Sequence, residues 1–247
     1  MKRKNTSINE TAPADRNRLI GQVMLALKGT TIQTADSIID EVKFYMNGGH
    51  SQANLEKLFD SQIARLKNRD NYNNFIDKLI AKRQAVIKQA LALNMPFDRI
   101  PFLPVITERY LNIHFLLKSV FFEGRMGFCR LDNLRLSNVV KVPDEPYYIF
   151  DVDDGTGSLD IEPWRAETNV KIAERSCLTD CEVVALGVHT GVLARHYLMA
   201  IGSRYSNGVE TCFPSLQVCN GKPIMDHRCL SNSPAQFLGT PSCSLRF

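Results

Sequence analysis

Eighteen residues near the C-terminus, Cys212–Cys229 (CFPSLQVCNGKPIMDHRC), constrain the fold of this 247-residue chain more than any other segment. Asn220-Gly221 at their centre is the strongest two-residue signal for a β-hairpin, because a type I′ turn needs positive φ at both central residues. If this turn forms, residues that face each other have numbers summing to 441. The sequence therefore predicts a hairpin in which Cys212 faces Cys229 at the open end.

Side chains alternate between the two faces of such a hairpin. One face is mostly apolar and carries Cys212, Pro214, Leu216, Val218, Pro223, Met225, His227 and Cys229. The other is mostly polar and carries Phe213, Ser215, Gln217, Cys219, Lys222, Ile224, Asp226 and Arg228. We therefore expect one face to be buried and the other to meet solvent. On the buried face Cys212 and Cys229 are expected to pack as thiols, although a cross-strand disulfide is geometrically possible.

Composition and charge indicate a globular protein. Hydrophobic residues make up 44% and charged residues 23% of the chain, and the net charge is +4. The net positive charge lies in residues 1–95, a modest excess that is more typical of helical surfaces than of a nucleic-acid site. No apolar run is long enough to span a membrane. Seven cysteines, an odd number, favour reduced thiols and a cytoplasmic protein. We expect an unknown small molecule or protein as its partner.

The first part of the chain has a helical period. Residues 1–12 resemble a disordered tail, and residues 13–95 carry four amphipathic stripes. The stripes lie around 19–27, 38–45, 55–66 and 75–90, and the last belongs to a helix running from about Tyr72 to Leu93. The pattern changes after Pro96, which leaves 96–247 as a second region.

Residues 96–247 mix short strands with helices. Strands are expected at 101–107, 147–152 and 197–201, where β-branched and aromatic residues lie between turn signals. A helix is expected from Pro163 to near Ser176, and Thr179 with Glu182 forms a capping box for another over 180–188. The predicted fold class is α+β, with an N-terminal helical region packed on or preceding a mixed domain that contains the 212–229 hairpin.

Several segments in this order resemble a bacterial family of uncharacterised proteins. They are PFLPVIT, GRMGF, PYYIFDVDDG, LTDCEVVALGVHTGVL, AIGSRY, PSLQV and QFLGTPSC, and FDSQIARL is similar to the opening helix of that family. The resemblance covers about residues 55–247. Phe237 stands where the family pattern leads us to expect Trp. The resemblance implies where the domain begins and ends and a bacterial, intracellular setting. Because the function of the family is unknown, it implies no catalytic residues.

The acidic segment FDVDDGT suggests a phosphatase. An apolar strand that ends in Asp151-x-Asp153 could place a nucleophile and an acid beside Mg²⁺. Gly155 occupies the motif's fifth position, where Thr or Val is expected, and the same letters suit a strand ending in an acidic turn. The Mg²⁺-dependent phosphatase is therefore an alternative and not the preferred hypothesis.

The cysteines and histidines suggest either zinc or thiol chemistry. Cys212, Cys219, Cys229 and Cys243 are separated by 7, 10 and 14 residues, unlike the close pairs of structural zinc sites, so we expect no metal or other cofactor. A thiol-dependent hydrolase or transferase could use Cys229 or Cys243 with His227. His189 and His196, on either side of Gly191, are other possible partners for a thiol.

The preferred hypothesis is a non-catalytic binding or interaction module. Its pocket is expected near the hairpin and the C-terminal loop, where Arg204 and Asp226 could form an internal ion pair or read an anion. The predicted ligand-binding residues are His189, Arg204, Asp226, His227 and Ser242. The thiol enzyme and the phosphatase stay open as alternatives.

Overall fold

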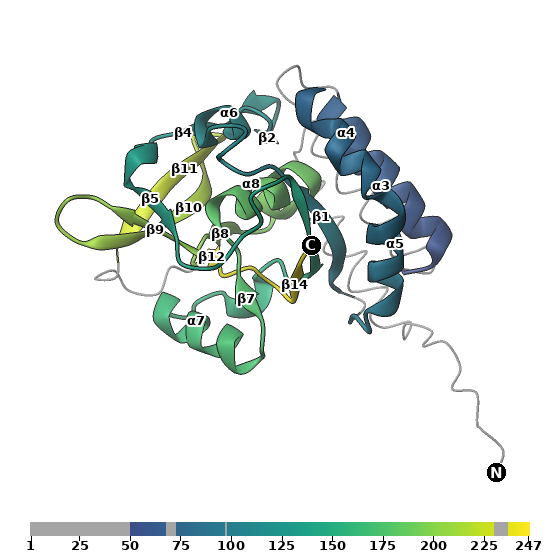
Figure 1. Cartoon of the computed structure of the whole chain (residues 1–247). Coiled ribbons are helices and arrows are strands. Elements are labelled where there is room, and N and C mark those ends of the chain that lie inside the picture. The colour runs from purple at the N-terminus through teal and green to yellow at the C-terminus, as the bar shows by residue number, and fades with distance from the viewer. Residues whose placement is uncertain (1–49, 68–72, 97, 230–236) are drawn as a thin grey trace, which may run out of the picture.

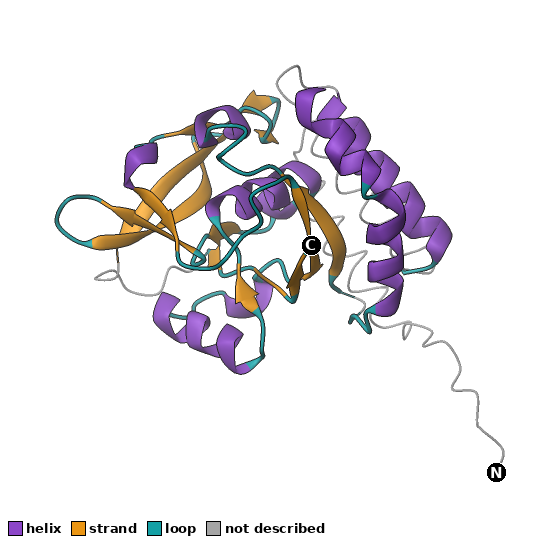
Figure 2. Ribbon diagram, in the orientation of Figure 1, coloured by secondary structure: helices purple, strands orange, loops and turns teal. Residues whose placement is uncertain are grey.

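The structure is a computed structural model that describes residues 50–67, 73–96, 98–229 and 237–247. It combines helices with largely antiparallel sheets, which confirms the α+β class (Figure 2). The predicted tail 1–12 and the first two helical stripes, around 19–27 and 38–45, lie outside the described residues. No helix in the described ranges is long and apolar enough to cross a membrane.

Three helices precede the first strand. They are α3 (Gln52–Lys67), α4 (Asn73–Ala81) and α5 (Arg83–Ala92). The predicted stripe of α3 is buried, with Leu55, Phe59 and Leu66 at most 3% exposed. The predicted single helix from about Tyr72 to Leu93 is interrupted at Lys82, whose amide donates to the carbonyl of Leu79 and not to that of residue 78. This tighter turn separates α4 from α5.

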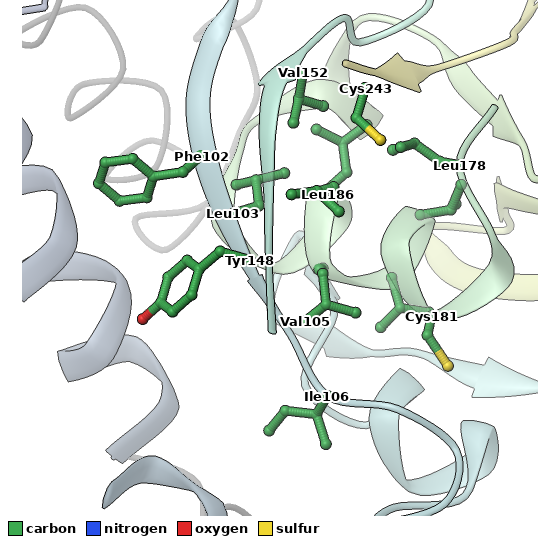
Figure 3. Close-up of a cluster of buried hydrophobic side chains, with 14 of the residues drawn as sticks. Phe102, Leu103, Val105, Ile106, Tyr148, Val152, Leu178, Cys181, Leu186 and Cys243 are labelled. Atoms are coloured by element: carbon green, nitrogen blue, oxygen red, sulfur yellow. The ribbon is translucent and has the colours of Figure 1, made fainter. Parts of the chain in front are cut away.

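The helices pack on a three-stranded antiparallel sheet, β1-β6-β14, made of β1 (Ile100–Val105), β6 (Tyr147–Val152) and β14 (Leu245–Arg246). Phe102 and Tyr148 point from this sheet toward the helices, whereas Leu103 points the other way (Figure 3). The ring of Phe59 stacks on that of Tyr148 at 5.7 Å. Both sheet faces are covered, and one hydrophobic core joins the helices to the strands.

A seven-stranded sheet has the order β12-β8-β10-β11-β4, with β9 also paired to β10 and β5 to β9. Its strands are β4 (Phe128–Cys129), β5 (Leu136–Asn138), β8 (Tyr197–Met199), β9 (Ser203–Ser206), β10 (Thr211–Cys219), β11 (Lys222–Cys229) and β12 (Leu238–Gly239). The predicted hairpin register is confirmed from Cys219↔Lys222 to Cys212↔Cys229. Asn220 and Gly221 have φ of 52° and 71°, as a type I′ turn requires.

The expectation that one hairpin face meets solvent holds near the turn, where Cys219 and Lys222 are exposed, and is wrong for the middle of the hairpin. Phe213, Ser215 and Ile224 belong to the face predicted to be polar, yet all three are at most 3% exposed. The helix α7 (Pro163–Ile172) explains the burial of Phe213, because Ala166 of α7 packs in one apolar cluster with it. Strand β10 is therefore a central strand with both faces covered.

Helix α8 (Asp180–His189) lies between the two sheets (Figure 1). It is buried along almost its whole length, as expected for a helix that contacts protein on all sides. A Cβ on Gly187 would come within 2.9 Å of Leu216 Cδ2 in β10, so a larger residue there would require the Leu216 side chain to shift. The predicted capping box of Thr179 and Glu182 is present at its N-terminus.

Shorter elements complete the described chain. They are α6 (Ile113–Leu117), β2 (Phe121–Phe122), β3 (Arg125–Met126), η2 (Asn133–Arg135), η3 (Thr156–Ser158), β7 (Ser176–Cys177), η4 (Val192–Ala194) and β13 (Ser242–Cys243). Because Ser176 belongs to a strand paired with β13, α7 ends at Ile172, earlier than predicted.

Glu182 forms a buried ionic network at the start of α8. Its side chain is fully buried and accepts hydrogen bonds from the Tyr147 hydroxyl at 2.7 Å and from the Thr179 amide at 2.8 Å. Arg246 completes the network with two donors at 2.7 and 2.8 Å. These contacts join α8 to β6 and to β14, which is the last strand of the chain.

Cys212 and Cys229 form a disulfide at the open end of the hairpin, with a Cα–Cα distance of 4.1 Å. The expectation of two packed thiols is therefore wrong for this pair. Directly opposed residues of a non-hydrogen-bonded pair approach closely enough for a bond between their sulfurs. The other five cysteines, all in the described ranges, are free.

The Arg246→Met substitution tests the buried network. It should lower the free energy of unfolding by about 3–5 kcal/mol, because the Glu182 carboxylate would stay buried without its cation. The measurement is urea unfolding followed by circular dichroism. The matched control is Arg109→Met, which removes an exposed ion pair with Asp144 and should change stability by less than about 1 kcal/mol. Equal losses in both variants would contradict the importance of the network.

Candidate functional site

A cavity of ≈ 450 Å³ opens beside the turn of the β10–β11 hairpin. Its aromatic and aliphatic walls come from residues on four separate parts of the chain, together with a few polar groups. The lining residues are Phe122, Glu123, Leu193, Ala194, Arg195, His196, Tyr197, Val218, Asn220, Gly221 and Phe237. Phe237 is 63% exposed, so it presents a large apolar surface at the rim.

An ion pair holds Arg195 at the wall of the cavity. Its guanidinium donates to Asp154 Oδ2 at 3.0 Å, and both side chains are less than one quarter exposed. Burial alone would raise the pKa of Asp154, but the neighbouring His196 and Arg195 side chains hold that pKa well below its usual range. The carboxylate therefore stays charged at neutral pH and fixes the position of the arginine.

His196 is only 3% exposed and makes two hydrogen bonds. Its Nδ1 lies 3.0 Å from the carbonyl of Tyr197, so this nitrogen carries the proton in the neutral ring. Its Nε2 lies 3.0 Å from Thr156 Oγ1 and 3.7 Å from Asp154 Oδ2. A hydroxyl paired with an imidazole resembles part of a nucleophilic triad, but Asp154 approaches the same nitrogen as the hydroxyl and does not orient the other one.

Two glycines allow the loops behind His196 to touch. Gly155 has φ of 90°, and a Cβ there would lie 2.8 Å from the Thr240 amide nitrogen. A Cβ on Gly239 would lie 2.5 Å from the Gly155 carbonyl and 3.1 Å from His196 Cε1. The segments DVDDG and FLGT, which are far apart in the sequence, therefore meet directly at this site.

Asp151 and Asp153 lie in separate ion pairs. Asp151 contacts Arg175 at 2.5 Å, and Asp153 contacts Arg99 at 2.5 Å. Within the described ranges, neither belongs to a group of three or more side chains that could hold a metal ion. Each aspartate is therefore paired with its own arginine.

The predicted ligand-binding residues do not converge on the cavity. Arg204 pairs with Glu167 of α7 and Asp226 pairs with Arg130, both at 3.0 Å, so the two have different partners. Ser242 is buried, and its hydroxyl accepts from Arg175. His189 is buried at the end of α8, and burial, assisted by the charge of Arg65, lowers its pKa well below the usual range.

His227 and Cys229 lie at the opposite end of the hairpin from the cavity, and Cys243 lies outside the hairpin, in β13. Cys229 is held in the disulfide, and the His227 ring lies 4.8 Å from that of Tyr205. Cys243 is fully buried, and burial raises the pKa of its thiol to about 12. Neither sulfur is an available thiolate in this structure.

Most of the residues that line the cavity could not be predicted from the sequence. His196 was considered only as a partner for a thiol, and Phe237 only as a departure from the family pattern. The polar residues Arg195 and Glu123 carry no local signal that marks them as ligands. A pocket was predicted near the hairpin and the C-terminal loop, but not at the turn.

A second cluster joins Glu108, Asp180 and Cys181 beside α8. Asp180 is 1% exposed, and its carboxylate accepts from the Cys181 amide at 2.8 Å and from the Ser203 hydroxyl at 3.1 Å. Burial, together with the charge of Asp180 and a hydrogen bond to it, raises the pKa of Glu108 to about 8. The two carboxyl groups therefore share a proton at neutral pH.

The fold and the site define an α+β domain in which N-terminal helices, two sheets and a cavity form one unit. Residues 57–244 match DUF5701, a family of unknown function, and the chain belongs to that family. The match begins within α3, so the family domain includes N-terminal helices as well as the sheets. No curated protein and no solved structure matches the sequence.

Glu108→Gln should change how stability depends on pH. A carboxyl with a raised pKa makes the folded state bind more protons than the unfolded state between pH 4.5 and about 8, so stability falls as pH rises through this window. The wild type should lose up to about 1 kcal/mol per pH unit there, and Glu108→Gln should show a flatter profile. Urea unfolding at several pH values between 5 and 8 measures the free energy of unfolding of both proteins. Parallel profiles in the two proteins would contradict the shared proton.

Proposed function

We propose that this protein binds a small organic molecule with a flat apolar body in the cavity beside the hairpin turn. The observation that carries the proposal is the cavity of ≈ 450 Å³ with aromatic side chains from separate chain segments. Small-molecule sites have volumes of about 300–1,000 Å³ and combine apolar walls with a few fixed polar groups. The cavity has a volume in this range and combines aromatic and aliphatic side chains with polar ones.

The lining suggests how such a ligand is held. Phe122, Tyr197 and Phe237 supply surfaces for an aromatic or heterocyclic ring. Arg195, held by Asp154, offers a donor for a carbonyl or carboxylate, and Glu123 accepts from a hydroxyl or amine. Together Arg195 and Glu123 favour a ligand that carries both an acceptor and a donor group on its ring.

Binding without catalysis agrees best with the contacts of the residues that the two enzyme hypotheses require. The aspartates required by the phosphatase hypothesis are engaged with Arg175 and Arg99. The thiol hypothesis requires Cys229 or Cys243, of which one is in a disulfide and the other is a buried thiol with a raised pKa. These features support the binding module over both enzymes.

The cellular location and the source organism are also part of the proposal. A cytoplasmic location is supported by the free thiol of the exposed Cys219, which a reducing compartment would protect from oxidation, whereas the Cys212–Cys229 disulfide needs an oxidant to form. A bacterial source is supported by the resemblance of the motifs alone. Neither membrane nor nucleic acid enters the proposal as a partner.

A fragment-binding experiment tests the cavity. Small aromatic carboxylates, amides and alcohols are screened against the full chain by saturation-transfer NMR, and hits are titrated. Phe237→Ala should weaken a hit about 10-fold, and Ala194→Trp should abolish binding by filling the cavity. The matched control is Trp164→Ala, which removes an aromatic side chain of similar exposure on α7, away from the cavity.

The control variant should bind each hit as tightly as the wild type. Thermal melting of all four proteins establishes that they are folded. If no fragment binds, or if a fragment binds Ala194→Trp as tightly as the wild type, the cavity is not the binding site.

A further inference from the structure

We propose that the open end of the β10–β11 hairpin is a redox-controlled site for Zn²⁺, with Cys212, Cys229 and His227 as ligands. The ligand atoms of these three side chains lie within 4.8 Å of one another. The site is at the far end of the hairpin from the proposed ligand cavity and does not depend on it. Its metal-binding form is the dithiol, and the disulfide is its metal-free form.

Strand pairing brings the two cysteines together although they are far apart in the sequence, which was the argument against a zinc site. The long separations along the chain do not restrict a site built across two strands, because Cys212 and Cys229 are direct partners in the hairpin register. His227 lies two residues before Cys229, so all three side chains are on one face of the hairpin. Thiolate sulfur and imidazole nitrogen are the ligands that Zn²⁺ prefers in proteins.

The imidazole is placed for this role. His227 Nδ1 is buried and makes no hydrogen bond, although it lies 3.3 Å from Asp226 Oδ1. The ring of Tyr205 lies 4.8 Å from that of His227 and limits the orientation of the imidazole. A carboxylate beside a metal-binding histidine is a common arrangement, because it holds the ring and increases its basicity.

The surroundings of Cys229 also favour a thiolate. Asn207 Nδ2 donates to Cys229 Sγ at 3.5 Å, a contact that stabilises negative charge on sulfur. Cys212 is fully buried, whereas Cys229 is partly exposed and is the last residue of β11. Three protein ligands with one side open to solvent leave a fourth position for water, as in zinc sites that are not closed.

The disulfide and the metal exclude each other, because both use the same two sulfurs. A dithiol reductant transfers two electrons to the Cys212–Cys229 bond, which becomes two thiols while the reductant becomes a disulfide. The two thiols then lose two protons as they bind Zn²⁺. In the reverse direction, a low-molecular-weight disulfide accepts two electrons, the Cys212–Cys229 bond forms and Zn²⁺ leaves. Zinc release would thus report oxidation.

The experiment uses the full chain in both redox states. Protein reduced with a phosphine and desalted without oxygen is titrated with Zn²⁺ against a chromophoric chelator, and with Co²⁺ for its sulfur charge-transfer and tetrahedral d–d absorption. The reduced wild type should bind one ion, and the oxidised protein should bind at least about 100-fold more weakly. Cys212→Ser and Cys229→Ser should lose binding to a similar extent.

Two further variants separate the ligands from their neighbours. His227→Ala leaves both sulfurs in place and should weaken Zn²⁺ binding by about 10–100-fold. Cys219→Ser is the matched control, because this free, exposed cysteine lies on the other face of the same hairpin. The Cys219→Ser variant should bind Zn²⁺ as tightly as the wild type.

Three results would overturn the proposal. One is a reduced wild type that binds no Zn²⁺, and another is an oxidised protein that binds it equally well. The third is binding that survives Cys212→Ser, Cys229→Ser and His227→Ala, which would place the metal elsewhere, for instance at Glu108, Asp180 and Cys181. If the cysteine variants fail to fold, as judged by circular dichroism, His227→Ala decides the question.

Discussion

The buried carboxylate of Glu182 is the interaction on which the rest of the structure depends. It caps α8 through the Thr179 amide and accepts from Tyr147 of the three-stranded sheet, and Arg246 of the last strand neutralises it. Because a buried charge needs both a counter-ion and hydrogen bonds, only one arrangement of these segments satisfies it. Helix α8 is thereby fixed between the two sheets, and the segment that follows it delivers Arg195 and His196 to the cavity wall.

The hairpin serves two sites because its ends differ. At the turn, Asn220 and Gly221 line the cavity together with residues from β2, η4 and the start of β8. At the open end, strand pairing brings two sulfurs and an imidazole together. The loop joining β9 to β10, which projects at the left in Figure 1, contributes Asn207 beside the sulfurs. The central part of the hairpin is buried on both faces and connects the two ends rigidly.

Features encoded by neighbouring residues could be predicted from the sequence. Positive φ at Asn220-Gly221 fixed the register of the hairpin, and the capping box fixed the start of α8. The burial of Phe213 could not be predicted in this way, since it depends on α7, which lies about 45 residues earlier. The separation of α4 from α5 at Lys82 was missed as well, because the apolar period of the sequence continues through it.

The sequence by itself determined the turn and register of the hairpin, the capping box of α8 and the facing of Cys212 with Cys229, because turn geometry and side-chain alternation act over a few residues. Tertiary structure alone decided that the hairpin lies at the centre of a sheet, that its cysteines are joined and that a cavity opens at its turn. It also decided which arginine neutralises each aspartate. Those outcomes depend on contacts between segments far apart in the chain, such as DVDDG with FLGT, and no local pattern records which distant segment will supply a partner.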